Sequence, residues 1–130
     1  EMLEEMLDVA RELGLWILLE AFDEADIAVM NDLVARRGVR DGLLLGVNSR
    51  DLQTLQVVPE RLLTLAGQLP AHLPRVAESG VGSANDAAAM AAAGWTMALV
   101  GTALMTAGAD DLAGAEHLAQ SMLAAARSVA

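Results

Sequence analysis

The chain has 130 residues, of which 55% are hydrophobic, and it carries 18 acidic against 8 basic residues, a net charge of −10. A field of this sign repels nucleic acid and anionic membrane surfaces, and no apolar run reaches the ~18 residues that cross a membrane, so we expect neither partner and predict a cytoplasmic location. Cysteine and lysine are both absent, which excludes thiol chemistry and requires any catalytic amine to come from outside this chain.

The chain opens on a helical pattern followed by an apolar run. Apolar residues at helical spacing over residues 3–13 predict a first helix, which Gly14 is placed to end in a left-handed cap. The run 15–19 then predicts a strand buried on both faces and ending at Glu20. Trp16, at the start of this strand, is expected to pack between the sheet and its helices.

Two further strands are expected, each preceded by a helix. Asp23 predicts the N-cap of a helix that ends at Gly38, and residues 42–47 predict the second strand. Pro59 suits the first turn of the next helix, and residues 75–77 predict the third strand. The inner face of the first of these helices is expected to be Ile27, Met30, Leu33 and Val34.

The last part of the chain repeats the alternation. Ser83 predicts the N-cap of an alanine-rich helix that Gly94 ends, and residues 95–100 predict the fourth strand. A short helix is expected to start near Thr102, and a long one over residues 112–128. Trp95, like Trp16, is expected to pack between sheet and helices.

One helix followed by four strand–helix units predicts an α/β fold with parallel strands. A complete (βα)₈ barrel takes ~250 residues, so residues 1–130 are expected to form one incomplete domain, a partial TIM barrel. The chain begins in mid-pattern, on a helix without a preceding strand or an initiator methionine. We therefore expect it to be the C-terminal half of a larger barrel.

Polar and glycine-containing segments follow the last three predicted strands, at residues 46–51, 78–80 and 100–102. The carboxyl ends of parallel strands meet at one edge of the sheet, so these segments are expected to gather there, where α/β proteins place their chemistry. Neither histidine is expected to ligate a metal, because both lie among solvated positions, His72 in a loop and His117 on a helix.

Four segments of the chain resemble, in order, the fifth to eighth strand ends of indole-3-glycerol phosphate synthase. They are Leu19-Glu20, Gly46-Val47-Asn48-Ser49-Arg50-Asp51-Leu52, Val76-Ala77-Glu78-Ser79-Gly80-Val81 and Ala98-Leu99-Val100-Gly101-Thr102-Ala103-Leu104-Met105. The resemblance implies a phosphate-binding barrel of tryptophan biosynthesis. That enzyme, a carbon–carbon lyase, closes carboxyphenylamino-deoxyribulose phosphate to indole-3-glycerol phosphate and releases carbon dioxide and water without a cofactor or metal.

The same resemblance implies roles for individual residues. Glu20 would be the catalytic carboxylate that transfers a proton during dehydration, and Asn48 with Arg50 would hold the anthranilate portion and its carboxylate. The remaining implied residues bind substrate, the last three by cradling its phosphate: Glu78, Ser79, Gly80, Gly101 and Thr102.

The chemistry of these residue types agrees with the implied roles. A carboxylate such as Glu20 at the end of an apolar strand is expected to have a raised pKa, as a proton-transfer group near neutral pH requires. Arg50 offers a planar fork that can grip a carboxylate through two hydrogen bonds. Gly80 and Gly101 let backbone N–H groups approach an anion.

Three of these residues also have a purely structural interpretation. Glu20 could cap the following helix, Arg50 could pair with Asp51 on a solvated loop, and Glu78 could be a structural carboxylate bonded to backbone amides. The family's two active-site lysines and its first-strand glutamate lie outside the half that this chain resembles. We therefore expect the chain to need the N-terminal half-barrel as a partner and to be inactive without it.

Other functions also remain open. The chain could be a non-catalytic half-barrel that persists by association, because a four-stranded fragment exposes two strand edges. It could also belong to another phosphate-binding barrel, such as a phosphoribosyl isomerase, although the segment Asn48-Ser49-Arg50 argues against this.

Overall fold

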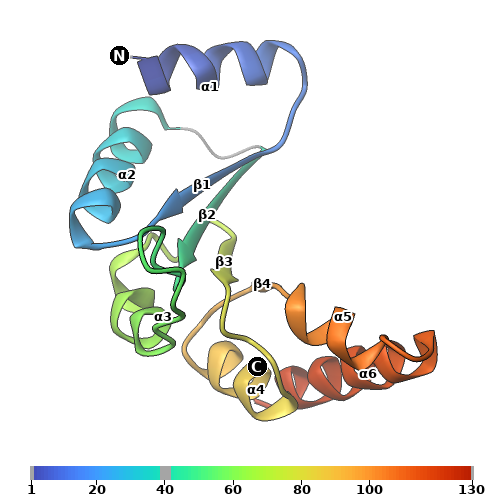
Figure 1. Ribbon diagram of the computed structural model, residues 1–130. Coiled ribbons are helices and arrows are strands. Elements are labelled where there is room, and N and C mark those ends of the chain that lie inside the picture. The colour runs from blue at the N-terminus through green and yellow to red at the C-terminus, as the bar shows by residue number, and fades with distance from the viewer. Residues whose placement is uncertain (1, 39–41, 130) are drawn as a thin grey trace.

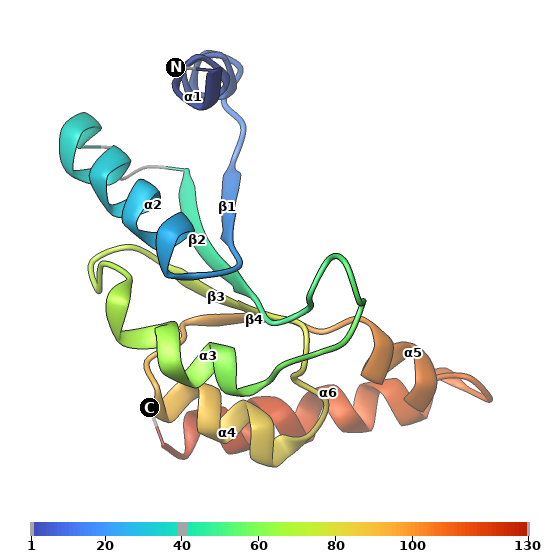
Figure 2. The same cartoon turned by 60° about the vertical axis from the view of Figure 1, so that its left-hand side comes forward.

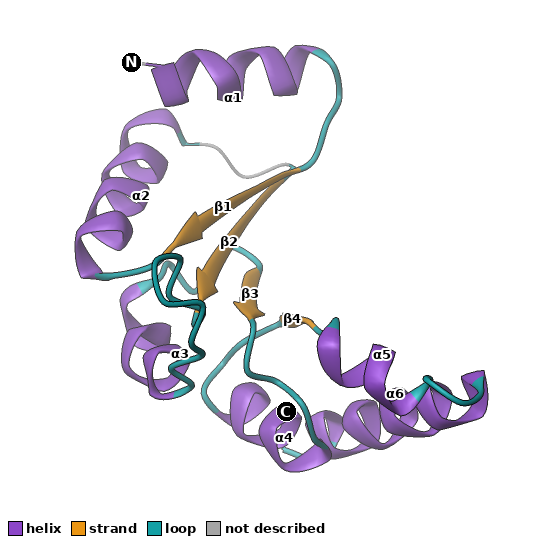
Figure 3. Cartoon of the chain, in the orientation of Figure 1, coloured by secondary structure: helices purple, strands orange, loops and turns teal. Residues whose placement is uncertain are grey.

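The centre of the protein is a four-stranded sheet in which neighbouring strands run parallel and follow chain order. The computed structural model describes residues 2–38 and 42–129. The strands are β1 (Ile17–Ala21), β2 (Leu43–Asn48), β3 (Arg75–Glu78) and β4 (Met97–Leu99). Figure 3 shows a helical segment between each consecutive pair of strands, so the predicted α/β fold with parallel units is confirmed.

The helices lie mainly on one face of this sheet. They are α1 (Met2–Glu12), α2 (Glu24–Arg37), α3 (Glu60–Leu65) with a 3₁₀ turn at Ala66–Gln68, α4 (Ala84–Ala92), α5 (Thr102–Ala107) and α6 (Leu112–Arg127). In both Figure 1 and Figure 2, α2, α3 and α4 line one face, α6 packs against α4 and α5, and the described helices leave the opposite face uncovered. A parallel sheet with helices along one face is the arrangement of half a TIM barrel.

Local capping explains why the helices begin where they do. Asp23 caps α2 by accepting the backbone N–H of Asp26 at 3.0 Å, and Asp26 in return accepts the N–H of Phe22 at 2.8 Å. Ser83 caps α4 by accepting the N–H of Asp86 at 3.2 Å. These reciprocal pairs fix the first turn of each helix, as the sequence predicted.

The two faces of the sheet have different environments. The buried residues of the face under the helices are all apolar, namely Leu19, Ala21, Leu43, Leu45, Val47 and Ala77. The strand register places a second set on the opposite side, which we call the open face: Leu18, Glu20, Leu44, Gly46, Asn48, Val76, Glu78, Met97 and Leu99. On β4, Met97 and Leu99 are 49% and 53% exposed, because nothing in the described residues packs over them.

The first strand departs from its prediction. β1 begins at Ile17, and Trp16 just before it is 73% exposed, so the prediction that Trp16 packs between sheet and helices is wrong. An apolar run cannot show which of its residues lies beyond the edge of the helical layer. Trp95 does pack as predicted: it is buried, and its indole N–H donates to the backbone oxygen of Leu62 at 3.2 Å.

Among the described residues, no helix combines the length and apolar character needed to cross a membrane. The same residues contain no cluster of three or more histidine, cysteine, aspartate or glutamate side chains placed to hold a metal ion. His72 and His117 are both exposed, in the environments expected of them.

Candidate functional site

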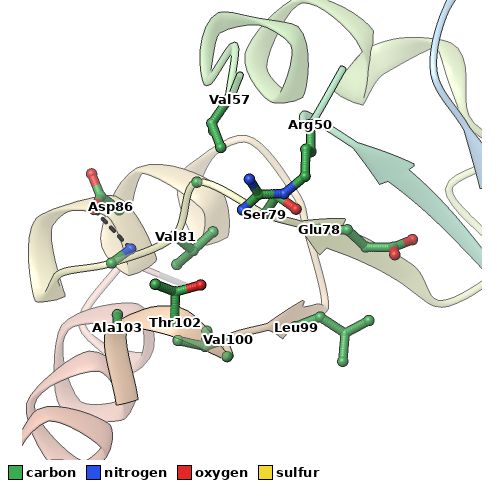
Figure 4. A pocket seen from close by; sticks show the side chains of 13 residues that line it. Arg50, Val57, Glu78, Ser79, Val81, Asp86, Leu99, Val100, Thr102 and Ala103 are labelled. Atoms are coloured by element: carbon green, nitrogen blue, oxygen red, sulfur yellow. Dashed lines mark hydrogen bonds between the residues drawn. The ribbon is translucent and has the colours of Figure 1, made fainter. Parts of the chain in front are cut away.

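A pocket of about 670 Å³ lies at the carboxyl ends of β3 and β4. Its wall combines the loop after β2, the loop after β3 and the start of α5, which are far apart in the sequence (Figure 4). Most residues singled out from the sequence line it, namely Arg50, Glu78, Ser79, Gly80, Gly101 and Thr102. Separate strand–helix units therefore bring these groups to one rim of the sheet.

Glu20 and Asn48 lie beside this pocket, on the open face. The side-chain amide of Asn48 donates to Oε2 of Glu20 at 3.5 Å, and its Oδ1 accepts the backbone N–H of Arg50 at 2.9 Å. The strand register also places Asn48 next to Glu78. Asn48 thus connects the exposed carboxylate of β1 with the arginine loop, on the strand beside Glu78.

Glu78 is the buried acid of the site, with 4% of its surface exposed. Burial raises its pKa to about 8, and the neighbouring carboxylate of Glu20 adds to this rise through a hydrogen bond and its negative charge. The Glu78 carboxyl points away from the Arg50 side chain (Figure 4), and its Oε1 is buried without a hydrogen-bond partner among the described residues. Glu78 is therefore protonated at neutral pH and can donate a proton to Glu20.

The sequence predicts a desolvated carboxylate at Glu20. In the structure Glu20 is exposed at the end of an edge strand, and the carboxyl group that is buried away from solvent is that of Glu78. The alternative interpretation of Glu78, a carboxylate bonded to backbone amides, does not fit an oxygen without a partner. The interpretation of Glu20 as a helix cap does not fit either, because Asp23 caps α2.

The turn after β3 has an uncommon backbone. Ser79 and Gly80 both lie in the left-handed region, with φ of 63° and 76°. For a serine this conformation costs about 1–2 kcal/mol, and such strain is often found in functional loops. A Cβ at Gly80 would lie 2.9 Å from Cγ1 of Val57 and 3.1 Å from Oγ of Ser49, so glycine lets this turn contact the loop after β2.

Arg50 is held by its own loop. Its backbone bridges to Val57 in an antiparallel pair, and its Nη1 donates to the backbone oxygen of Leu55 at 2.9 Å. The carboxylate of Asp51 instead accepts the N–H groups of Gln53 and Thr54, at 2.9 and 2.8 Å. The suggested pairing of Arg50 with Asp51 is therefore not the arrangement found, and the guanidinium keeps donors available at the pocket.

Gly101 lies beside open space at the pocket. A Cβ at this position would have no atom within 4 Å among the described residues, so the protein itself does not require a glycine there. Gly101 precedes the first residue of α5, Thr102, and both are exposed at the pocket. The space around Gly101 is thus open to a ligand rather than filled by a neighbouring segment.

Three residues of the site were missed by sequence reasoning. Nη1 of Arg61 donates to the backbone oxygen of Asn48 at 3.0 Å and so holds the end of β2. Ser49 is fully buried, and its Oγ has no partner among the described residues. Gly46 lies in the middle of the open face, between Glu20 and Val76 in the register. Gly46 and Ser49 lie in the segment 46–51 singled out from the sequence, but the roles of all three residues are not visible in a local pattern, because each acts across elements.

Comparison with known proteins agrees with this geometry. The family described as indole-3-glycerol phosphate synthase matches residues 1–116. Curated relatives with this name include those of Micrococcus luteus, 43% identical over 106 residues, and of Exiguobacterium sp., 38% identical over 103 residues. These matches cover 81% and 79% of this chain, respectively.

One solved structure extends the comparison to the fold. A chain of the Amycolatopsis orientalis BexX/CysO complex is similar with a TM-score of 0.54 and 26% sequence identity, over 94% of this chain and 48% of that one. The curated relatives are also longer than this chain, which spans only 37% and 38% of the two named above. A family match over residues 1–116, supported by these relatives, shows that the chain belongs to the indole-3-glycerol phosphate synthase family.

Proposed function

We propose that the protein containing this chain is an indole-3-glycerol phosphate synthase, which closes carboxyphenylamino-deoxyribulose phosphate with loss of carbon dioxide and water. The observation that carries the proposal is the convergence of Arg50, Glu78, Gly80 and Thr102 on one pocket beside Glu20. The names of the relatives favour this synthase over a phosphoribosyl isomerase. Its expected cytoplasmic location remains a prediction.

Different residues of the pocket are placed to bind different parts of the substrate. The phosphate of the substrate would lie against the backbone of Gly80, Gly101 and Thr102, where open space and N–H groups suit an anion. The free donors of Arg50 would grip the substrate carboxylate. Because Arg50 and Glu78 line the same pocket, the ring-closing atoms would lie near the Glu20–Glu78 pair.

The carboxyl pair suits the dehydration step. Loss of water needs a group that delivers a proton to the departing hydroxyl and one that accepts a proton from the substrate. Glu78, whose pKa of about 8 favours its protonated form at neutral pH, lies beside Glu20, and the two carboxyl groups can share a proton. Glu20 is the exposed member of the pair, and we therefore assign it the direct contact with substrate.

We also propose that this chain is inactive by itself. It contains no lysine, so it has no amine to protonate the substrate carbonyl, and its open face leaves Met97 and Leu99 uncovered. In a turnover assay with carboxyphenylamino-deoxyribulose phosphate, the complete protein is expected to release indole-3-glycerol phosphate and the isolated chain none. Turnover by the isolated chain would contradict this proposal, because it would show that this chain alone carries every group that catalysis requires.

The second candidate function, a half-barrel that acts only by association, is favoured by the same exposed residues of β4. It predicts an isolated chain that binds other barrel segments without turnover. A complete protein that folds but releases no product would favour this candidate over the synthase.

Arg50→Lys in the complete protein is expected to lower kcat/KM by about 10- to 100-fold, mainly through KM, because an ammonium replaces two fork-like hydrogen bonds by one contact. Initial rates over a range of substrate concentrations measure this. Arg127→Lys, at the exposed end of α6, is the matched control and should change neither constant. Equal constants for Arg50→Lys and Arg127→Lys would remove Arg50 from substrate binding.

A further inference from the structure

Gly46 occupies a position on the open face that no neighbouring backbone forces to be glycine. It lies within β2, between Glu20 of β1 and Val76 of β3 in the register, and it is absent from the residues with positive φ. Its lack of a side chain therefore needs another reason. The reason lies in what fills the space above it.

The space above Gly46 is occupied by the carboxyl group of Glu78. A Cβ built at Gly46 would overlap Oε1 of Glu78 and lie 3.1 Å from its Cδ, and it would approach Cδ1 of Leu18 to 3.0 Å. The Glu78 side chain therefore leans across β2 toward β1, where Glu20 stands in register with Gly46. With any larger residue at position 46, the two carboxyl groups could not approach each other over β2.

We propose that Gly46 is a positioning residue, which provides the space in which the carboxyl group of Glu78 lies beside Glu20 and forms the proton-sharing pair of the active site. This inference rests on the proposed function for its consequence in turnover, but its geometric part does not. The atoms that a Cβ would displace most belong to the far end of a flexible glutamate. Gly46→Ala is therefore expected to move the Glu78 carboxyl rather than unfold the sheet.

Among the described residues few ionisable groups lie around Glu78, and those that the rest of the complete protein adds are the same with and without a substitution at Gly46. Glu20 faces it from β1, and Arg50 and Asp86 line the pocket on its other side. The residues that β2 and β4 present on the open face, including Asn48 and Leu99, do not ionise. A change in the titration of Glu78 on substitution of Gly46 therefore reports its distance from Glu20 and its burial.

The first test is a titration that needs no turnover. In the complete protein labelled with ¹³C at glutamate carboxyl carbons, Glu78→Gln identifies the Glu78 signal by its loss. Gly46→Ala is expected to lower the titration midpoint of that signal relative to the unsubstituted protein. The control is Gly67→Ala, at a position with no atom within 4 Å of a Cβ, and it should leave the midpoint unchanged. An unchanged midpoint in Gly46→Ala would overturn the inference.

The second test uses turnover and a compensating change. Gly46→Ala is expected to lower kcat by about 10- to 100-fold with little change in KM, because a displaced carboxyl misorients the proton transfer. Glu78→Asp shortens the side chain and so withdraws its carboxyl group from the methyl group added at position 46. The double variant with Gly46→Ala and Glu78→Asp should therefore be more active than the product of the two single variants' activity losses predicts. Activity losses that simply multiply in the double variant would contradict the steric account. A Gly46→Ala protein that fails to fold, and that Glu78→Asp does not restore, would contradict it as well.

The two tests separate this inference from the function on which it rests. If the complete protein lacks synthase activity while Gly46→Ala still lowers the midpoint of Glu78, the proposed function fails and the positioning role stands. If synthase activity is present and Gly46→Ala behaves like Gly67→Ala in both tests, the function stands and the positioning role fails.

Discussion

Glu20→Gln in the complete protein is expected to lower kcat by roughly 10² to 10⁴, because one proton transfer loses its acid–base group while the shape of the side chain is kept. KM should change little, since Arg50 and the phosphate cradle are untouched. Steady-state rates of indole-3-glycerol phosphate formation at neutral pH measure the effect.

The matched control for this substitution is Glu12→Gln, at the exposed end of α1 and remote from the pocket. It should retain the full kcat. A Glu20→Gln variant with the turnover of Glu12→Gln would remove Glu20 from the mechanism and leave Glu78 as the acid–base group to be tested.

Glu78→Gln is expected to stabilise the isolated chain at alkaline pH. The folded state raises the pKa of Glu78 from 4.5 to about 8, so between these values it binds a proton more tightly than the unfolded chain does. Stability contributed by the protonated carboxyl is therefore complete below pH 4.5 and is lost as the pH rises through about 8. The loss is on the order of 3–5 kcal/mol, and an uncharged glutamine avoids it.

Urea unfolding at a series of pH values tests this expectation. The wild-type chain should lose stability between pH 5 and pH 9 relative to Glu78→Gln, and the two should converge in acid. Glu116→Gln, on the exposed side of α6, should follow the wild type at each pH. Parallel curves for Glu78→Gln and the wild type would show that the buried carboxyl is not protonated in the folded chain.

Much of the fold could be predicted because its signals are local. The cap pairs Asp23 with Asp26 and Ser83 with Asp86 act within one turn, and Gly38 and Gly94 end their helices in the left-handed region that favours glycine. The strands were recognised from short apolar runs between these helices. Which residue of a run begins the strand depends on the neighbouring strand, so the exposure of Trp16 was not predictable.

The site was predictable as a set of residues but less so as chemistry. The strand-end segments gave Arg50 and Glu78 as neighbours, because parallel strands bring their carboxyl ends to one edge. The burial of Glu78 depends on the space above Gly46, one strand away, and sequence reasoning therefore assigned the desolvated carboxylate to Glu20. The hydrogen bond from Arg61 to the backbone of Asn48 at the end of β2 likewise joins different elements, so no local pattern predicts it.

The most direct measurement of the central claim is a crystal structure of the complete protein with indole-3-glycerol phosphate bound. We predict that the phosphate lies within hydrogen-bond distance of the backbone at Gly80 and Thr102. The indole should then lie between Arg50 and the Glu20–Glu78 pair. A phosphate bound at another edge of the sheet, or carboxyl groups of Glu20 and Glu78 that point to different sides of the ligand, would contradict the account.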